Sequence, residues 1–384
     1  MTEPTTTGNP GATGLNLDPT TLLGGGTLGR QILITTIAIV LGLLVGAILI
    51  IVSGLIGPSA TFDPTLPFTA YGALLEGSLS NPKAIANTLN STTPLIFAGL
   101  SVAFGFRAGL FNIGANGQLP VGGFCAALVG MIAGLPGPIA IVAALFAGAI
   151  GGAAWGFIPG ALKAWRGAHE VVTTIMLNST AYLLLNLLAS STFKDPGATF
   201  PRTPDIQPAA VLGIIVENTR LHGGIFIAVI TAVAIWFLLF KTVLGFEIRT
   251  VGANASAARY AGIRPAFITI LTMSVAGALA GIGGGVEILG ITKNYPAEYI
   301  VSYGFDGIAV ALLGRAHPLG VVGAALLFGV LRAGSGAMQR ASDIPVDIIS
   351  IVQGVILLFV AAQIIIERLI APRARRRQAA AAAV

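Results

Sequence analysis

The chain has 384 residues, of which 55% are hydrophobic and 9% are charged, and its formal net charge is +6. Charged residues make up about a quarter of an ordinary soluble domain. This composition and the mean hydropathy of +0.88 exclude a soluble globular protein and place the chain in a lipid bilayer. Its positive charges flank apolar runs instead of forming one basic face, so they indicate membrane topology and argue against nucleic-acid binding.

Apolar runs of spanning length follow a polar N-terminal stretch. Residues 1–28, rich in Thr and Gly, are expected to form a disordered cytoplasmic tail. Several later runs reach the ~20 apolar residues that a spanning helix needs, and short alternating strands typical of a barrel are not evident. We expect an all-α, polytopic membrane protein with about ten spanning helices, near residues 31–57, 87–106, 110–133, 137–162, 171–192, 222–240, 265–290, 300–315, 317–338 and 346–366.

The distribution of Arg and Lys predicts the orientation. An even number of spans places both termini on one side, and Arg30 with the arginines of the C-terminal stretch assigns that side to the cytoplasm. Residues 29–370 would form a single transmembrane domain, followed by a basic cytoplasmic tail at 371–384. The outer loops 58–83 and 193–221 are too short to fold separately and are expected to cap the outer mouth.

One expected span is unusually polar. The stretch 111–123, FNIGANGQLPVGG, combines amides with Gly and Pro. Backbone groups left unpaired in hydrocarbon cost several kcal/mol each. We therefore expect a broken or re-entrant segment that lines a cavity. The two short segments on either side of Arg315 to Pro318 could form a hairpin instead of two full spans.

Motifs for catalysis are missing. No lysine follows a glycine, so the phosphate-binding P-loop is absent, and neither a Gly-x-Ser-x-Gly nor a His-Glu-x-x-His pattern occurs. No catalytic residue and no metal site are predicted, because the three histidines lack ligand partners at suitable spacing. A transporter of this kind would draw its energy from another subunit or from an ion gradient.

Ionisable residues within the spans are few. Asp306 lies in an expected span, whereas Glu287 and Arg332 are expected near the outer interface. Such a small set argues against a proton relay. The spacing of Gly277, Gly281 and Gly285 is typical of close helix packing in membranes.

The insert from Glu247 to Arg264 (EIRTVGANASAARYAGIR) separates two apolar runs and is expected to dock a partner. Its pattern resembles the coupling loop of bacterial ATP-binding-cassette (ABC) importer permeases, in the group for branched-chain amino acids, ribose and nucleosides. Two further segments are similar to signatures of that group: Gly105–Leu119 (GFRAGLFNIGANGQL) and Tyr303–Leu319 (YGFDGIAVALLGRAHPL). The GFRAGLFNIG form with Asn116 and Gln118 resembles most the larger permease subunit of nucleoside (simple sugar) importers.

The resemblance implies a transport subunit of the bacterial inner (cell) membrane without a nucleotide site of its own. A separate ABC ATP-binding subunit would hold ATP and Mg, and no cofactor is implied for this chain. Further implied partners are a second homologous permease, giving a heterodimer, an extracytoplasmic substrate-binding lipoprotein and membrane lipids. Within the coupling loop, 241–264, the residues expected to seat on the ATPase are Gly252, Asn254, Ala257, Ala258, Arg259, Tyr260 and Gly262. Lipid phosphates are the alternative contact for Arg259.

The implied substrate is a nucleoside or a related simple sugar. The residues expected along its path are Phe111, Asn112, Asn116, Gln118 and Asp306. Uncharged amides suit a neutral polar solute, although they could instead satisfy the segment's own backbone. Members of the group often carry an acidic residue where Asn116 stands. A branched-chain amino acid or other small-solute permease of the same group, an ion-coupled secondary transporter and a membrane assembly protein remain alternatives.

Overall fold

A computed structural model describes residues 27–56, 62–299, 302–343, 345, 347–356 and 358–359. Its helices are α1 (Thr27–Ile56), α2 (Leu66–Leu79), α3 (Pro82–Arg107), α4 (Ala115–Gly130), α5 (Gly137–Arg166), α6 (Glu170–Ser190), η1 (Pro208–Ala210), α7 (Gly224–Lys241), α8 (Val243–Ala253), α9 (Ala255–Tyr260), α10 (Pro265–Glu287), the π-helical turn η2 (Ile288–Thr292), α11 (Tyr303–Leu313) and α12 (Pro318–Ser342). A further helix spans Asp347–Ile356. In these residues only two isolated bridges add β-type pairing.

The helices confirm an all-α membrane protein. Six of those described, α3, α5, α6, α7, α10 with η2, and α12, are long and apolar enough to cross a bilayer, and three shorter apolar helices accompany them. Each of the ten expected segments contains helix in its described part. The expected tails lie outside the described residues, except that residues 27 and 28 belong to α1.

Helix α2 corrects the expectation that residues 58–83 form only an outer loop. Its 14 residues would extend about 21 Å, which is too short to cross the hydrocarbon core. The helix packs on α12, where Leu74 lies against Gly334, and the Tyr71 hydroxyl donates to the Leu43 carbonyl of α1 at 2.7 Å. Single-span hydropathy did not reveal α2 because its stability comes from these neighbours.

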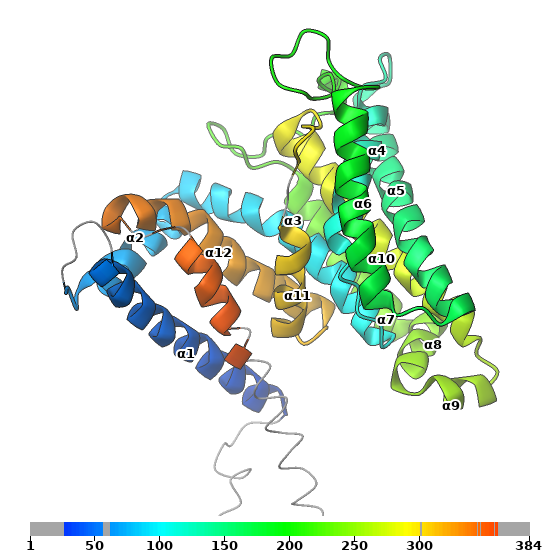
Figure 1. Ribbon diagram of the computed structural model, residues 1–384, viewed down its shortest axis with the longest axis horizontal. Helices are drawn as coiled ribbons and strands as arrows, with labels where there is room; N and C mark the ends of the chain where they lie inside the picture. The colour runs from blue at the N-terminus through cyan, green and yellow to red at the C-terminus, as the bar shows by residue number, and fades with distance from the viewer. Residues whose placement is uncertain are drawn as a thin grey trace, which may run out of the picture.

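Two groups of helices share α3 (Figure 1). Helices α4, α5, α6 and α10 stand side by side in one group, while α1, α2 and α12 form the other. Helix α3 runs between them and is buried almost throughout. Helices α5, α6 and α7 instead leave large apolar side chains exposed, as lipid-facing spans do.

Glycines bring α4, α5 and α10 into backbone contact. A Cβ added at Gly277 or Gly281 of α10 would overlap the carbonyl oxygens of Gly152 and Gly148 of α5, respectively. A Cβ at Gly122 of α4 would overlap Gly281. Small residues allow such close approach in membranes, where packing drives helix association. The packing role predicted for the spaced glycines of α10 is therefore confirmed.

Candidate functional site

The chain breaks between α3 and α4 at residues 108–114. Gly109 has a φ of +72°, a left-handed conformation that glycine adopts without steric cost. The backbone N–H groups of Ala108 and Leu110 both donate to the Gly105 carbonyl at 3.0 Å, which ends α3. The predicted break is thus present but shorter than 111–123. Residues 115–123 are helical because Gly117, Gly122 and Gly123 pack directly on neighbouring helices.

Two predicted path residues, Asn112 and Gln118, bond to one another. The Asn112 Nδ2 donates to Gln118 Oε1 at 2.9 Å, and Gln118 Nε2 donates to Asn112 Oδ1 at 3.1 Å. Asn112 Nδ2 also donates to Ser101 Oγ of α3 at 3.0 Å. Both amides are buried and do not line the nearby cavity. Their pairing fixes the break against α3 and α4, and a direct contact with solute stays a prediction.

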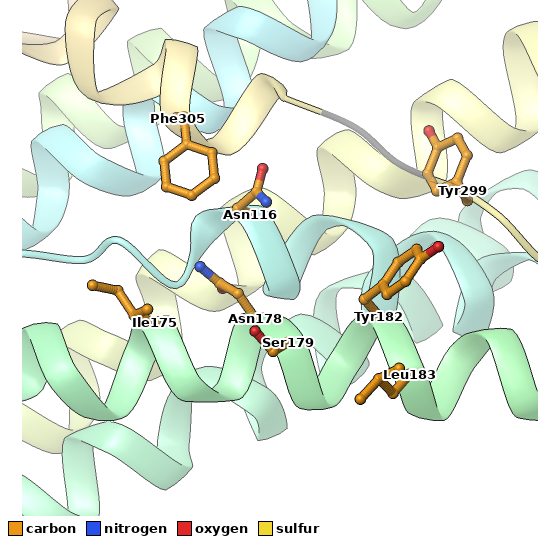
Figure 2. A pocket seen from close by; sticks show the side chains of 8 residues that line it. All are labelled: Asn116, Ile175, Asn178, Ser179, Tyr182, Leu183, Tyr299 and Phe305. Atoms are coloured by element: carbon orange, nitrogen blue, oxygen red, sulfur yellow. The ribbon is translucent and has the colours of Figure 1, made fainter.

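A cavity of about 450 Å³ opens between the start of α4, helix α6 and helix α11. Figure 2 shows Asn116 projecting between α6 and α11, with the Phe305 ring on one side. Its lining residues carry amide, hydroxyl, aromatic or aliphatic side chains and no charge: Asn116, Ile175, Asn178, Ser179, Tyr182, Leu183, Tyr299 and Phe305. A mostly apolar pocket with a few polar groups is the usual form of a small-molecule site.

Several polar atoms of the cavity wall lack a hydrogen-bond partner in the described part of the chain. These atoms are Asn116 Oδ1, Asn178 Oδ1 and the Tyr299 hydroxyl. The Asn178 Nδ2 donates to the Ile113 carbonyl at 3.1 Å and so ties α6 to the break. Buried polar groups are nearly always paired, so these three atoms keep a hydrogen-bonding capacity that no described group of the chain uses.

Phe111 and Asp306 lie away from the cavity wall. The half-buried Phe111 ring packs on Phe106, with 5.2 Å between ring centroids. Asp306 accepts a hydrogen bond from the Arg332 guanidinium at 3.0 Å, and that guanidinium lies 4.3 Å from the Tyr303 ring centroid. The Asp306–Arg332 ion pair joins α11 to α12, which satisfies the carboxylate within the protein.

Sequence reasoning missed most of the cavity. Asn178 and Ser179 are amide and hydroxyl groups inside an otherwise apolar run, LNSTAYLLL, and that polarity was a usable signal. Tyr299 and Phe305 gave no such signal. Tyr299 lies in the chain after η2, on which the outer loop packs, since Thr203 N donates to the Tyr295 carbonyl at 3.0 Å. Phe305 reaches the cavity because the preceding Gly304 packs directly on the Asn116 backbone.

The predicted docking segment forms α8 and α9 at one end of the molecule (Figure 1). The Asn254 side chain caps α9 by accepting from the Ala257 N–H at 3.0 Å. Tyr260 is 95% exposed, whereas Ala258 is fully buried and anchors the helix. Gly262 follows with a φ of +83°. Of the other predicted docking residues, Ala257 and Arg259 are exposed.

Gly252 faces inward. A Cβ built there would lie 2.8 Å from the Ala108 carbonyl carbon and 2.9 Å from the Gly109 nitrogen, and nearer still to the Arg107 oxygen. The end of α8 therefore touches the backbone that begins the break. The docking segment and the cavity are connected through seven residues, 108–114.

These features define a multi-pass membrane permease with an exposed short helix, α9, and an uncharged cavity. A family described as "Branched-chain amino acid transport system / permease component" matches residues 84–361. The chain belongs to this family. No solved structure matches it.

Three characterised relatives cover most of the chain. The guanosine ABC transporter permease protein NupP of Bacillus subtilis is 40% identical over 86% of this chain and 93% of its own length. The nucleoside ABC transporter permease protein NupB of Lactococcus lactis is 36% identical, over 92% and 96% respectively. The glucose ABC transporter permease protein TsgB13 of Haloferax volcanii is 33% identical, over 76% and 80%. The predicted membership of the ABC importer permeases is confirmed.

Proposed function

We propose that the chain is the permease subunit of an ABC importer that translocates nucleosides, powered by ATP and Mg on a separate ATPase subunit. The observation that carries this is the uncharged cavity at Asn116, walled by amide and aromatic side chains. The flat base of a nucleoside can stack on the rings of Tyr182, Tyr299 or Phe305. Its ribose hydroxyls can form hydrogen bonds with the Asn116 amide and the Ser179 hydroxyl. The guanosine and nucleoside relatives support the same solute class.

The cavity wall also supports a second permease as partner. Leu183 is 65% exposed and Phe305 is 52% exposed, so the cavity is open on one side of this chain. A solute path through a bilayer has to be enclosed, and a homologous permease placed on this side would close it. The lipoprotein that delivers the solute would then dock at the outer ends, with α9 and both chain termini in the cytoplasm.

Coupling would run from α9 to the cavity through residues 108–114. Docking of the ATPase on Tyr260 and Arg259 would move α8, and Gly252 would transmit that displacement to Gly109 through direct backbone contact. The break ends one residue before α4, whose second residue is Asn116. A rigid connection of this kind can link ATP-driven motion to exposure of the cavity.

Uptake of labelled guanosine tests the proposal in cells that lack their own nucleoside transport and express the whole importer. We expect unlabelled adenosine to reduce the uptake of labelled guanosine, and glucose and leucine to leave it unchanged. Asn116→Ala should raise the KM about two- to tenfold, the range for loss of one neutral hydrogen bond. Ser190→Ala is the control, because that hydroxyl donates only within α6, to the carbonyls of Asn186 and Leu187.

The alternatives predict different results. The glucose relative makes a simple sugar the second candidate, which uptake of labelled glucose without guanosine uptake would establish. Guanosine accumulation in the absence of the ATPase subunit would instead identify an ion-coupled transporter and overturn the proposal. An unchanged KM in Asn116→Ala would remove that residue from the solute path.

A further inference from the structure

A second cavity, remote from the solute cavity, lies at the beginning of α3. Its volume is about 360 Å³, and its lining residues are Lys83, Asn87, Asn218, Thr219 and Arg220. The first two belong to α3 and the others to a hairpin at residues 211–222, just before α7. The opposite end of α3, at Arg107, is the end that contacts the docking segment. The cavity is therefore at the far end of α3 from α9.

The 211–222 hairpin is held in shape by its own hydrogen bonds. Ile215 N donates to the Leu221 carbonyl at 2.8 Å, and the Thr219 hydroxyl donates to the Val216 carbonyl at 2.7 Å. Asn218 has a φ of +60°, a left-handed conformation that asparagine tolerates better than most residues. The base of the hairpin is fixed to η2, where Leu212 N donates to the Leu289 carbonyl at 3.0 Å. The hairpin thus presents its tip to α3 in a defined position.

The cavity is cationic. Lys83 and Arg220 are its charged lining residues, and no carboxylate lines it. Among the described residues neither cation forms an ion pair. Glu217 adjoins the tip in sequence but is not part of the lining. Two cations without an ion pair, together with the amides of Asn87 and Asn218, match a phosphate group, which needs both charge and several hydrogen-bond donors.

Apolar side chains on the same hairpin indicate where that phosphate comes from. Ile214 is 61% exposed, Ile215 is 43% exposed and Val216 is 37% exposed. Helix α7 follows directly, and its first turns continue the exposed apolar surface with Phe226, which is 60% exposed. Basic residues beside exposed apolar ones, next to a spanning helix, are typical of segments at the membrane interface.

We propose that this cavity binds the phosphate of an anionic phospholipid headgroup through Lys83 and Arg220. The hairpin residues Ile214, Ile215 and Val216 contact the upper acyl chains of the same leaflet. The bound lipid links the beginning of α3 to the segment before α7. This site is independent of the solute that the permease carries.

Native mass spectrometry of the purified, delipidated full-length chain tests the site. The protein is titrated with phosphatidylglycerol, with phosphatidylcholine or with inorganic phosphate. We expect one phosphatidylglycerol to bind about 25-fold more weakly in the double variant Lys83→Gln, Arg220→Gln, because each interfacial cation contributes a factor of about five in affinity and the two factors multiply. Lys194→Gln, at an exposed lysine of the 193–221 loop that does not line the cavity, is the control and should bind as the wild type does.

Three outcomes would overturn the proposal. Equal binding of phosphatidylglycerol by the double variant and the wild type would show that the two cations hold no lipid. Binding of inorganic phosphate as strong as that of the lipid would assign the cavity to a soluble anion. Unchanged lipid binding together with loss of the extracytoplasmic binding protein in a pull-down would assign it to a protein partner. A thermal melt of each variant establishes that it is folded before binding is compared.

Discussion

The substitution Gly252→Ala separates docking from coupling. The added Cβ would lie 2.8 Å from the carbonyl carbon of Ala108 and 2.9 Å from the nitrogen of Gly109. Ordinary carbon contacts are about 3.5–4.0 Å, so the two backbones have to move apart by roughly half an ångström or more. Overpacking of this kind typically costs about 1–3 kcal/mol. The 108–114 backbone resists this movement, because it is hydrogen-bonded to α3 and α6.

The overlap destabilises the contact between α8 and residues 108–114 and does not involve α9. We expect the Gly252→Ala chain to assemble with the ATPase subunit. The assembled importer should then hydrolyse about three to ten times more ATP for each nucleoside imported, which corresponds to about 1 kcal/mol of strain in the state that couples hydrolysis to transport. Purified importer in proteoliposomes gives both rates from one preparation. The control is Gly323→Ala in α12, where an added Cβ meets no atom within 4 Å.

The same comparison can refute the coupling path. If Gly252→Ala imports nucleoside with the wild-type ratio of ATP hydrolysed to solute moved, the contact with Gly109 transmits nothing. If Gly323→Ala changes that ratio as much as Gly252→Ala does, the effect belongs to glycine replacement in a helix in general. A variant that fails to assemble with the ATPase would show that Gly252 serves the docking surface itself.

Three further predictions concern the core and the docking helix. Asn112→Leu and Gln118→Leu should each destabilise the chain by about 1–3 kcal/mol in denaturant titrations, because each removes the partner of a buried amide. The double variant should lose clearly less stability than the sum of the two single variants, and additive losses would disprove the pairing. Gly281→Leu should lower the free energy of unfolding by about 3 kcal/mol or more, because the new side chain overlaps α5. Samples heated to a series of temperatures and then run on size exclusion give the apparent melting temperature, and a wild-type value would contradict this. Tyr260→Ala should weaken binding of the ATPase subunit at least tenfold in pull-down titrations, as loss of an exposed aromatic anchor does, whereas equal loss in Phe246→Ala would show that the docking surface is not centred on α9.

Helices of the membrane domain follow directly from the sequence. A run of about twenty apolar residues in a bilayer has to pair its backbone groups internally, and a helix does so without help from the rest of the chain. The end of α3 was also predictable in part, since GFRAGLFNIG puts Gly109 where a left-handed residue ends the helix. The Asn254 cap at α9 is a local interaction of the same kind, between residues three positions apart.

The length of the break could not be predicted because α4 is stabilised from outside. Residues 115–123 are rich in glycine and contain Pro120, which taken alone disfavours a helix. In the folded chain, those glycines allow backbone contact with α10, and burial between helices compensates for weak intrinsic propensity. Helix α2 escaped prediction for the same reason, since α12 and α1 provide its packing surface.

The sequence by itself determined that the chain is a helical membrane permease, because apolar length and short signature motifs are local properties. Only the tertiary structure decided which amides face one another and which face the cavity. Asn112 and Gln118 carry the same functional group as Asn116, yet they are buried as a pair while Asn116 meets Tyr299 and Phe305 across the cavity. That difference depends on where α3, α6 and α11 come together, and no pattern within one segment contains this information.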